Sequence, residues 1–298
     1  MKNTVFTGAA TAIITPFNTD NTVDFESFGK LIDFQIENKT DSIVVCGTTG
    51  ESATMPDKEH LEAVEFAVKH TAGRVPVIAG AGSNDTYHGT ELCAEAAKLG
   101  IDGLLLVTPY YNKTTQHGLI KHYETMVSKV SDIPVILYNV PGRTGLNIKP
   151  STVYELSKID NIVGIKEASG DLVQAIEIKK LCGDDFAIYS GNDDIVVPLM
   201  SIGAKGVISV LANVMPYETH LMCKNCLEGN FAEAAKFQIK AIDLINALFS
   251  EVNPVPVKTA LNMMGMNVGS LRMPLCDMLD STRENLKQQM INMGIIKD

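Results

Sequence analysis

The chain has 298 residues, of which 45% are hydrophobic, and it carries a formal net charge of −10 from 25 basic and 35 acidic residues. This composition is typical of a globular protein with enough apolar material for one large domain or two. The acidic balance, without any long basic block, argues against a nucleic-acid partner because little is available to neutralise phosphates. Residues 5–14 are too short and too polar for a membrane span or a signal peptide, so we expect a cytoplasmic protein without membrane contact.

Short apolar runs alternate with amphipathic segments through the first two thirds of the chain. The runs predict strands at residues 9–14, 42–46, 77–79, 103–107, 135–139, 162–166, 187–190 and 206–209. The amphipathic segments predict helices at residues 24–37, 57–70, 85–99, 115–130, 150–157, 172–181 and 193–202. Asp85 and Ser151 are expected to cap two of these helices.

The strands recur at the spacing of one βα unit, and eight such units predict an α/β fold, the (β/α)8 or TIM barrel. An open, doubly wound sheet is the alternative. It is disfavoured because Gly80-Ala-Gly82 lacks the third glycine of a dinucleotide fingerprint, and no phosphate-binding P-loop motif occurs.

After residue 209 the strand signal stops, and helices are predicted at residues 217–227, 231–249, 257–264 and 283–293. The first of these is expected to complete the barrel as its eighth helix. The others predict a C-terminal helical appendage. We therefore expect a catalytic barrel over residues 1–228 and a C-terminal helical region over residues 229–298.

Six cysteines are scattered along the chain, which indicates reduced thiols rather than a disulfide framework. Cys223 and Cys226 have the spacing of a metal-binding pair, but no second pair or nearby histidines complete a ligand set. Because both lie in a helical pattern, we interpret them as packed helix thiols. The sequence predicts no metal site.

Lys166 ends the predicted buried strand at residues 162–166, although lysine is among the residues least often buried. One interpretation is a lysine whose stem packs in the core while its ammonium group reaches water. The other is a desolvated amine, partly neutral, that attacks a carbonyl and forms a Schiff base.

Polar residues also gather at the ends of other predicted strands, where a TIM barrel places its active site. They are Thr48, Thr49, Tyr111, Tyr138 and Arg143. Each has a plain structural alternative: a turn for the threonines, a barrel-filling aromatic for Tyr138, and a solvated loop charge for Arg143. Near a Schiff-base lysine, however, Tyr138 suits a proton shuttle, and the guanidinium of Arg143 suits a carboxylate.

Three motifs add specificity: Gly47-Thr-Thr-Gly-Glu-Ser52, Tyr138-Asn-Val-Pro-Gly-Arg-Thr-Gly145 and Gly164-Ile-Lys-Glu-Ala168. Together they resemble the dihydrodipicolinate synthase family, which belongs to the pyruvate-dependent class I aldolases along with N-acetylneuraminate lyase. The likeness extends to Asn253-Pro-Val-Pro-Val-Lys258 and so covers nearly the whole chain.

The resemblance implies a lyase that condenses pyruvate with L-aspartate 4-semialdehyde through an imine on Lys166. The product would be 4-hydroxy-tetrahydrodipicolinate, in the diaminopimelate route of lysine biosynthesis. Tyr138 would relay protons through Thr48 to Tyr111 of the partner subunit. The resemblance also implies a homotetramer built as a dimer of dimers, with no metal or organic cofactor.

The substrate-binding roles also follow from the resemblance. Thr48 and Thr49 would hold the pyruvate carboxylate, and Arg143 would receive the carboxylate of aspartate semialdehyde. Gly191 and Ile208 would contribute backbone carbonyls near the lysine.

Feedback inhibition is a further expectation of the same kind. Family members inhibited by lysine bind it at a dimer interface, and five residues here match that pattern: Ser52, Ala53, His60, Asn84 and Tyr110. Asp57 and His88 depart from the pattern, replacing a histidine and a glutamate. Because the lost glutamate could pair with the ligand's ammonium group, we expect weak or absent inhibition by lysine.

Two other functions are considered. A retro-aldol lyase acting on a sugar acid would need pocket groups for a polyol chain, whereas Arg143 suits a short substrate that ends in a carboxylate. A non-catalytic barrel that binds a keto acid as a sensor is disfavoured by the presence of Lys166, Tyr138, Thr48 and Tyr111 together.

Overall fold

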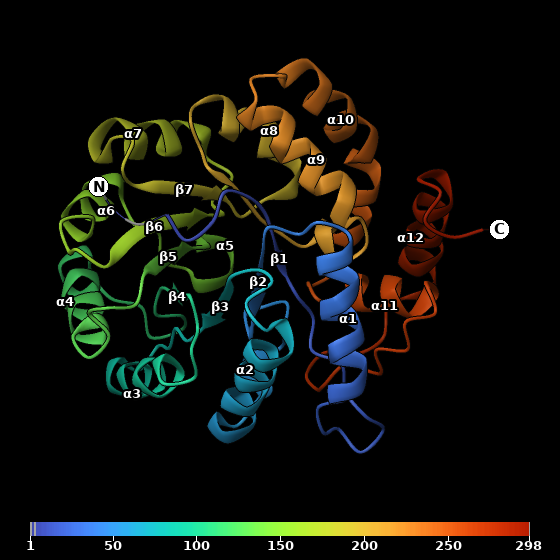
Figure 1. The fold of residues 1–298 in the computed structure, drawn as a ribbon, viewed down its shortest axis with the longest axis horizontal. Helices are drawn as coiled ribbons and strands as arrows, with labels where there is room; N and C mark the ends of the chain where they lie inside the picture. The colour runs from blue at the N-terminus through green and yellow to red at the C-terminus, as the bar shows by residue number, and fades with distance from the viewer. Residues whose placement is uncertain (1, 3, 298) are drawn as a thin grey trace.

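The computed structural model describes residue 2 and residues 4–297, and Figure 1 shows the path of the chain. Eight parallel strands form one closed barrel in chain order, and β8 pairs with β1. The strands are β1 Gly8–Ala12, β2 Ser42–Val45, β3 Val77–Gly80, β4 Gly103–Val107, β5 Val135–Asn139, β6 Ile162–Glu167, β7 Ala187–Ser190 and β8 Gly206–Ser209. The predicted (β/α)8 barrel is confirmed, and the open sheet is excluded.

Helices follow every strand and form the outer ring of the barrel (Figure 1). They are α1 Phe25–Glu37, α2 Asp57–Thr71, α3 Thr86–Ala97, α4 Gln116–Val127, α5 Pro141–Thr144, α6 Pro150–Leu156, α7 Leu172–Cys182, α8 Val196–Ser201 and α9 Pro216–Leu227. Three short 3-10 turns, η1 Ser52–Thr54, η2 Asp193–Ile195 and η3 Leu211–Asn213, follow β2, β7 and β8. Helix α9 follows β8 and packs on β1, as expected of the eighth barrel helix.

Three further helices, α10 Phe231–Leu248, α11 Val255–Met263 and α12 Asp280–Asn292, complete the chain along one side of the barrel (Figure 1, orange to red). Helix α10 packs on α8 and α9, and α11 contacts η3 at the end of β8. The predicted C-terminal helices are therefore present. The division of the chain at residues 228 and 229 stays a prediction. No helix among the described residues is long and apolar enough to cross a membrane.

The apolar side chains separate into two layers because successive residues of a strand point to opposite faces of the sheet. One cluster fills the barrel interior and includes Ile136 and Tyr138 from β5 and Val163 from β6. The larger cluster lies between strands and helices and includes Leu137 and Ile165. Val163 and Ile165 face opposite sides although they are two residues apart, because the pairing of β5 with β6 shifts register between Val135 and Ile136. Beyond this shift the alternation holds, and Lys166, which follows the outward-facing Ile165, lies on the inner face in register with Tyr138.

Some predicted boundaries and caps differ from the structure. Asp85 caps α3 as predicted, its carboxylate accepting from two backbone N–H groups. Ser151 does not cap α6, because Pro150 already occupies the first helical turn, where its missing N–H costs nothing. Strand β1 ends at Ala12 rather than residue 14; Ile14 N–H instead donates to the side chain of Asn213 at 3.2 Å.

Cys223 and Cys226 are buried free thiols on α9, which confirms their interpretation as packing residues. Arg143, for which a loop position was one alternative, lies instead on the single helical turn α5, Pro141–Thr144. Proline at the first position favours this turn, and Gly145 ends it in the left-handed conformation at φ 70°.

Gly164 offers a test of the tight packing around β6. A Cβ at this position would lie 2.5 Å from the carbonyl oxygen of Ala187 on β7, so the paired strands would have to move apart. We expect Gly164→Ala to lower the free energy of unfolding in urea by about 1–3 kcal/mol, the usual cost of overpacking. Gly142→Ala is the matched control, since its Cβ would meet nothing within 4 Å. Equal stability of the two variants would contradict the prediction.

Candidate active site

Lys166 lies inside the barrel near the carboxyl end of β6, and only 6% of the residue is exposed. Its Nζ atom lies 4.4 Å from the centroid of the Tyr138 ring. Most of the residue is therefore removed from water, which favours the interpretation of a desolvated amine. Within the described chain, no hydrogen-bond acceptor or carboxylate contacts Nζ; its close neighbour is the aromatic face.

Gly191 gives the Lys166 stem its space. A Cβ on Gly191 would lie 3.1 Å from Lys166 Cε and 2.5 Å from Ala168 Cβ. The Gly191 N–H donates to the carbonyl of Glu167 at 2.7 Å, which ties the end of β7 to the end of β6. Gly191 therefore lies beside the Lys166 stem, and the role of its backbone carbonyl stays a prediction.

A polar network on the opposite face of the same two strands was not predicted. The buried carboxylate of Glu167 accepts from Asn139 Nδ2 at 3.0 Å, from Gln174 Nε2 at 3.0 Å and from Ser169 N–H at 2.7 Å. Glu167 and Asn139 directly follow Lys166 and Tyr138, and they pair in register. The network therefore holds the strand ends that carry the lysine and the tyrosine.

Asp193 is a second buried carboxylate that the sequence did not single out. Its oxygens accept from Ser209 Oγ at 2.6 Å and from the N–H groups of Val210 and Leu211 at 3.0 and 2.9 Å. Burial raises the pKa of Asp193, while these donors and the nearby Lys166 charge act in the opposite direction. Asp193 fixes the end of β8, directly after the fully buried Ile208.

A cavity of about 400 Å³ opens over this end of the barrel. Thr48, Tyr138 and Arg143 are among its lining residues, so the structure brings together groups from the ends of β2 and β5. Arg143 is exposed, Thr48 is half-buried and Tyr138 is buried. Two hydroxyls and a guanidinium therefore border one space, and the Lys166 amine lies against the ring of Tyr138, one of the lining residues.

Asn253, just before α11, joins two of the predicted substrate-binding residues. Its Nδ2 donates to Thr49 Oγ1 at 3.0 Å, and its carbonyl accepts from Arg143 Nη2 at 3.1 Å. The sequence did not identify this role. The only signal was that Asn253 begins the last family-like motif.

Tyr111 lies apart from these groups within one chain. Its side chain is 92% exposed, and its backbone has φ 69°, a left-handed conformation that is rare for an aromatic residue. The structure therefore does not bring Tyr111 together with Tyr138 and Thr48 of the same chain.

The residues predicted to bear on lysine inhibition share the same cavity. Those that line it are Ser52, Ala53, Asp57, His60, His88 and Tyr110. Asn84 instead donates from Nδ2 to the carbonyl of Tyr110 at 3.2 Å.

Asp57 and His88 form a pair in this cavity. His88 Nε2 lies 2.9 and 3.0 Å from the two oxygens of Asp57, and its Nδ1 lies 3.0 Å from Ser83 Oγ. The cavity contains the Asp57 carboxylate, which is paired with His88 through both oxygens. Weak or absent inhibition by lysine stays a prediction.

The arrangement suits covalent carbonyl chemistry more than metal chemistry. Among the described residues, no group of three or more His, Cys, Asp or Glu side chains is placed to hold a metal ion. A buried amine beside a tyrosine can attack a carbonyl and exchange protons with a hydroxyl, while an arginine at the mouth binds a carboxylate.

Comparison with known proteins shows which family the chain resembles. The model of the dihydrodipicolinate synthetase family matches residues 5–292. The 4-hydroxy-tetrahydrodipicolinate synthase of Caldicellulosiruptor saccharolyticus is 56% identical over 291 residues, or 98% of each chain. Among solved structures, dihydrodipicolinate synthase from Aquifex aeolicus is 44% identical, with a TM-score of 0.95 over 98% of this chain and 100% of that one. DHDPS from Cyanidioschyzon merolae with lysine bound is 41% identical, with a TM-score of 0.96 over 99% of this chain and 100% of that one.

The Glu167 network yields a testable prediction. Glu167→Gln replaces one acceptor oxygen by an NH2 group, so at least one of the surrounding donors loses its acceptor in a buried place. We expect a loss of about 1–3 kcal/mol in the free energy of unfolding in urea. Glu177→Gln, an exposed change on the neighbouring helix α7, should have no measurable effect. A Glu167→Gln variant as stable as this control would contradict the prediction.

Proposed function

The chain belongs to the dihydrodipicolinate synthetase family, and we propose that Lys166 is the residue on which its covalent chemistry takes place. The activity is the condensation of pyruvate with L-aspartate 4-semialdehyde to 4-hydroxy-tetrahydrodipicolinate, a step of lysine biosynthesis by the diaminopimelate route. The observation that supports Lys166 is its position. It is a buried amine beside Tyr138, close to a cavity with carboxylate-binding groups.

The first half of the reaction activates pyruvate. Lys166 Nζ attacks the keto carbon and water leaves, which gives an imine between the lysine and pyruvate. The protonated imine accepts electron density when the methyl group loses a proton, and an enamine forms. Thr48 and Thr49 hold the carboxylate of pyruvate, and Tyr138 transfers the protons.

The second half joins the two substrates. The enamine carbon attacks the aldehyde carbon of aspartate semialdehyde, and the resulting alkoxide takes up a proton. The substrate amine then attacks the imine carbon and releases Lys166 as the ring closes, so one water molecule is lost overall. Arg143, exposed at the cavity, binds the carboxylate of this second substrate.

Gly191 and Ile208 complete the proposed site. The contact of Gly191 with the Lys166 stem supports a role beside the amine. Ile208 lies at the end of β8, on the inner face of the barrel. We propose that the backbone carbonyls of both residues accept hydrogen bonds from the reacting groups.

We propose that the working unit is a dimer or a larger assembly, specifically a homotetramer built as a dimer of dimers. The support is Tyr111, whose exposed ring and left-handed backbone are costly in a single chain. Both features are accounted for if Tyr111 of the partner subunit completes the proton relay through Thr48 and Tyr138. The cytoplasmic location stays a prediction.

The sugar-acid lyase is the weaker candidate for this site. Arg143 and the Thr48–Thr49 turn supply two carboxylate-binding groups, as required by two short acids. The relative from Caldicellulosiruptor saccharolyticus also bears the name of a synthase.

Borohydride trapping tests the proposed function. Incubation with pyruvate and borohydride should reduce the imine to a stable secondary amine, and intact mass and peptide mapping should place one pyruvyl adduct on Lys166. Lys166→Ala should remain folded and take up no adduct. A folded wild-type protein without an adduct would contradict the proposal, and so would an adduct that persists in Lys166→Ala.

Tyr111→Phe tests the shared site. Removal of one proton-transfer hydroxyl should lower kcat by about 10²–10⁴-fold. The thermal midpoint should change little, because phenylalanine keeps the aromatic ring and only the hydroxyl is lost.

Subunit mixing sharpens this test. When Tyr111→Phe and Lys166→Ala subunits are unfolded together and refolded, mixed dimers contain one site with both residues intact. Activity should then rise above that of either variant. Absence of such complementation would exclude a contribution of Tyr111 to the partner's site.

A further inference from the structure

Glu51 is held by a part of the chain that follows the barrel. Its Oε1 lies 2.8 Å from Lys258 Nζ on α11, and its Oε2 accepts from the Arg272 N–H at 3.0 Å. The Glu51 and Lys258 side chains are each only 1% exposed. The ion pair is therefore buried, and both carboxylate oxygens of Glu51 contact residues of the C-terminal region.

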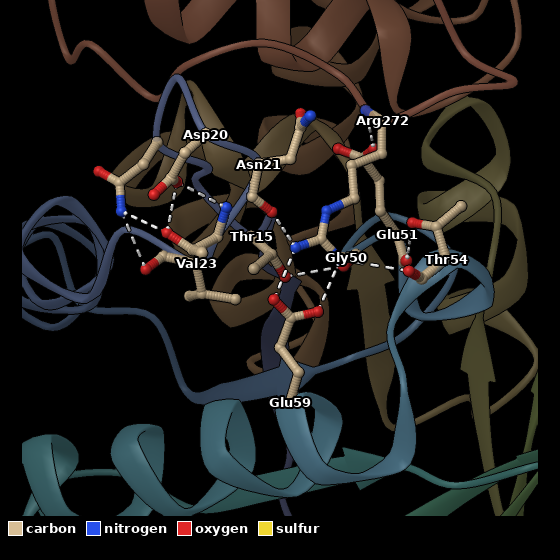
Figure 2. Close-up of polar contacts among 11 residues, drawn as sticks. Thr15, Asp20, Asn21, Val23, Gly50, Glu51, Thr54, Glu59 and Arg272 are labelled. Atoms are coloured by element: carbon tan, nitrogen blue, oxygen red, sulfur yellow. Dashed lines mark hydrogen bonds and ion pairs between the residues drawn. The ribbon is translucent and has the colours of Figure 1, made fainter.

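Glu51 belongs to the turn at residues 47–52, which also carries Thr48 and Thr49. Its backbone has φ 57°, a left-handed conformation, and its N–H donates to the Thr48 carbonyl at 3.2 Å. The preceding residue of the turn, Gly50, is also held: its carbonyl accepts from Thr15 Oγ1 at 2.7 Å, three residues after the end of β1 (Figure 2). A non-glycine residue in this conformation needs neighbours that hold it.

Arg272 forms a second, outer pair beside the first. Its guanidinium contacts both carboxylate oxygens of Glu59 on α2 at 2.6 Å and also donates to the carbonyls of Thr54 and Asn21 (Figure 2). The Phe17 ring lies 4.0 Å from Lys258 Nζ and 4.0 Å from the Arg272 guanidinium carbon. The outer pair therefore joins α2 to the C-terminal region, whereas the inner pair holds the 47–52 turn.

Stability alone does not account for the inner pair. Removing two charges from water costs about as much as their attraction returns, and apolar residues of similar shape often stabilise as well or better. Burial lowers the pKa of Lys258 to about 8, and the nearby Glu51 opposes that change. Unlike apolar packing, a hydrogen-bonded ion pair fixes the orientation of both side chains.

We propose that Glu51 and Lys258 are positioning residues that hold the 47–52 turn in the shape in which Thr48 and Thr49 bind the carboxylate of pyruvate. This inference rests on the proposed function. It makes the C-terminal helical region part of the substrate site rather than an appendage.

The geometry of α11 supports this role. Asn253, just before the helix, bonds Thr49, and Lys258 on the helix bonds Glu51 two residues further along the turn. The segment of residues 253–258 therefore contacts the turn at two residues, Thr49 and Glu51. Loss of the Lys258 contact should leave the turn less ordered without removing any group that touches pyruvate.

The deciding variant is the double change Glu51→Gln with Lys258→Met. It removes both buried charges together, so no unpaired charge remains to unfold the protein, and the new amide oxygen at position 51 can still accept from the Arg272 N–H. We expect a cooperatively unfolding protein in which the pyruvate concentration for half-maximal borohydride trapping on Lys166 rises about tenfold. The KM for pyruvate should rise in parallel, with smaller changes in kcat and in the KM for aspartate semialdehyde.

Glu59→Gln is the matched control, because it breaks the outer pair and leaves the 47–52 turn untouched. This variant should lose thermal stability while its half-saturating pyruvate concentration stays within twofold of wild type. A folded double variant that binds pyruvate like wild type would overturn the inference, and so would an equal rise in Glu59→Gln. Wild-type protein that traps no pyruvate would instead overturn the proposed function.

Discussion

The candidate site depends on the register between β5 and β6. Tyr138 pairs with Lys166, and one residue further along Asn139 pairs with Glu167. Because side chains alternate across a strand, the first pair faces the barrel interior and the second faces the helices. The same backbone pairing thus places an amine beside a phenol on one face and a network of amides around a carboxylate on the other. A shift of one residue would exchange the two faces and leave a carboxylate inside the barrel.

Five buried charged residues differ in how many hydrogen-bond or ion-pair partners surround them. Glu167 and Asp193 are each satisfied by three or more donors, and Lys258 pairs with Glu51. Among the described residues, Lys166 has no such partner, and its ammonium group contacts only the face of Tyr138. This amine, which has no hydrogen-bonded partner within the described chain, is the group on which we propose that the imine forms.

Much of the fold could be predicted because its signals are local. Each strand is a short apolar run, each helix has its own period, and the spacing of eight units predicts the barrel. The same topology predicts that Thr48, Tyr138 and Arg143 converge, since the ends of parallel strands share one rim. The contacts of Asn253 and Lys258 could not be predicted, because they span 204 and 207 residues and nothing local marks their partners. The position of Tyr111 could not be predicted from one chain either, if its partner belongs to another.

These long-range contacts connect two loops that are not joined directly by strand pairing in the barrel. Thr49 follows β2 and Arg143 follows β5, and β3 and β4 lie between these strands in the ring. No strand pairing therefore sets the distance between the two proposed carboxylate-binding groups, and the loops that carry them could move independently. Asn253 contacts both groups, and Lys258 holds the first of their loops through Glu51. If the two loops bind two short acids that meet at one amine, as we propose, a segment outside the βα repeat is in contact with both and can fix their separation.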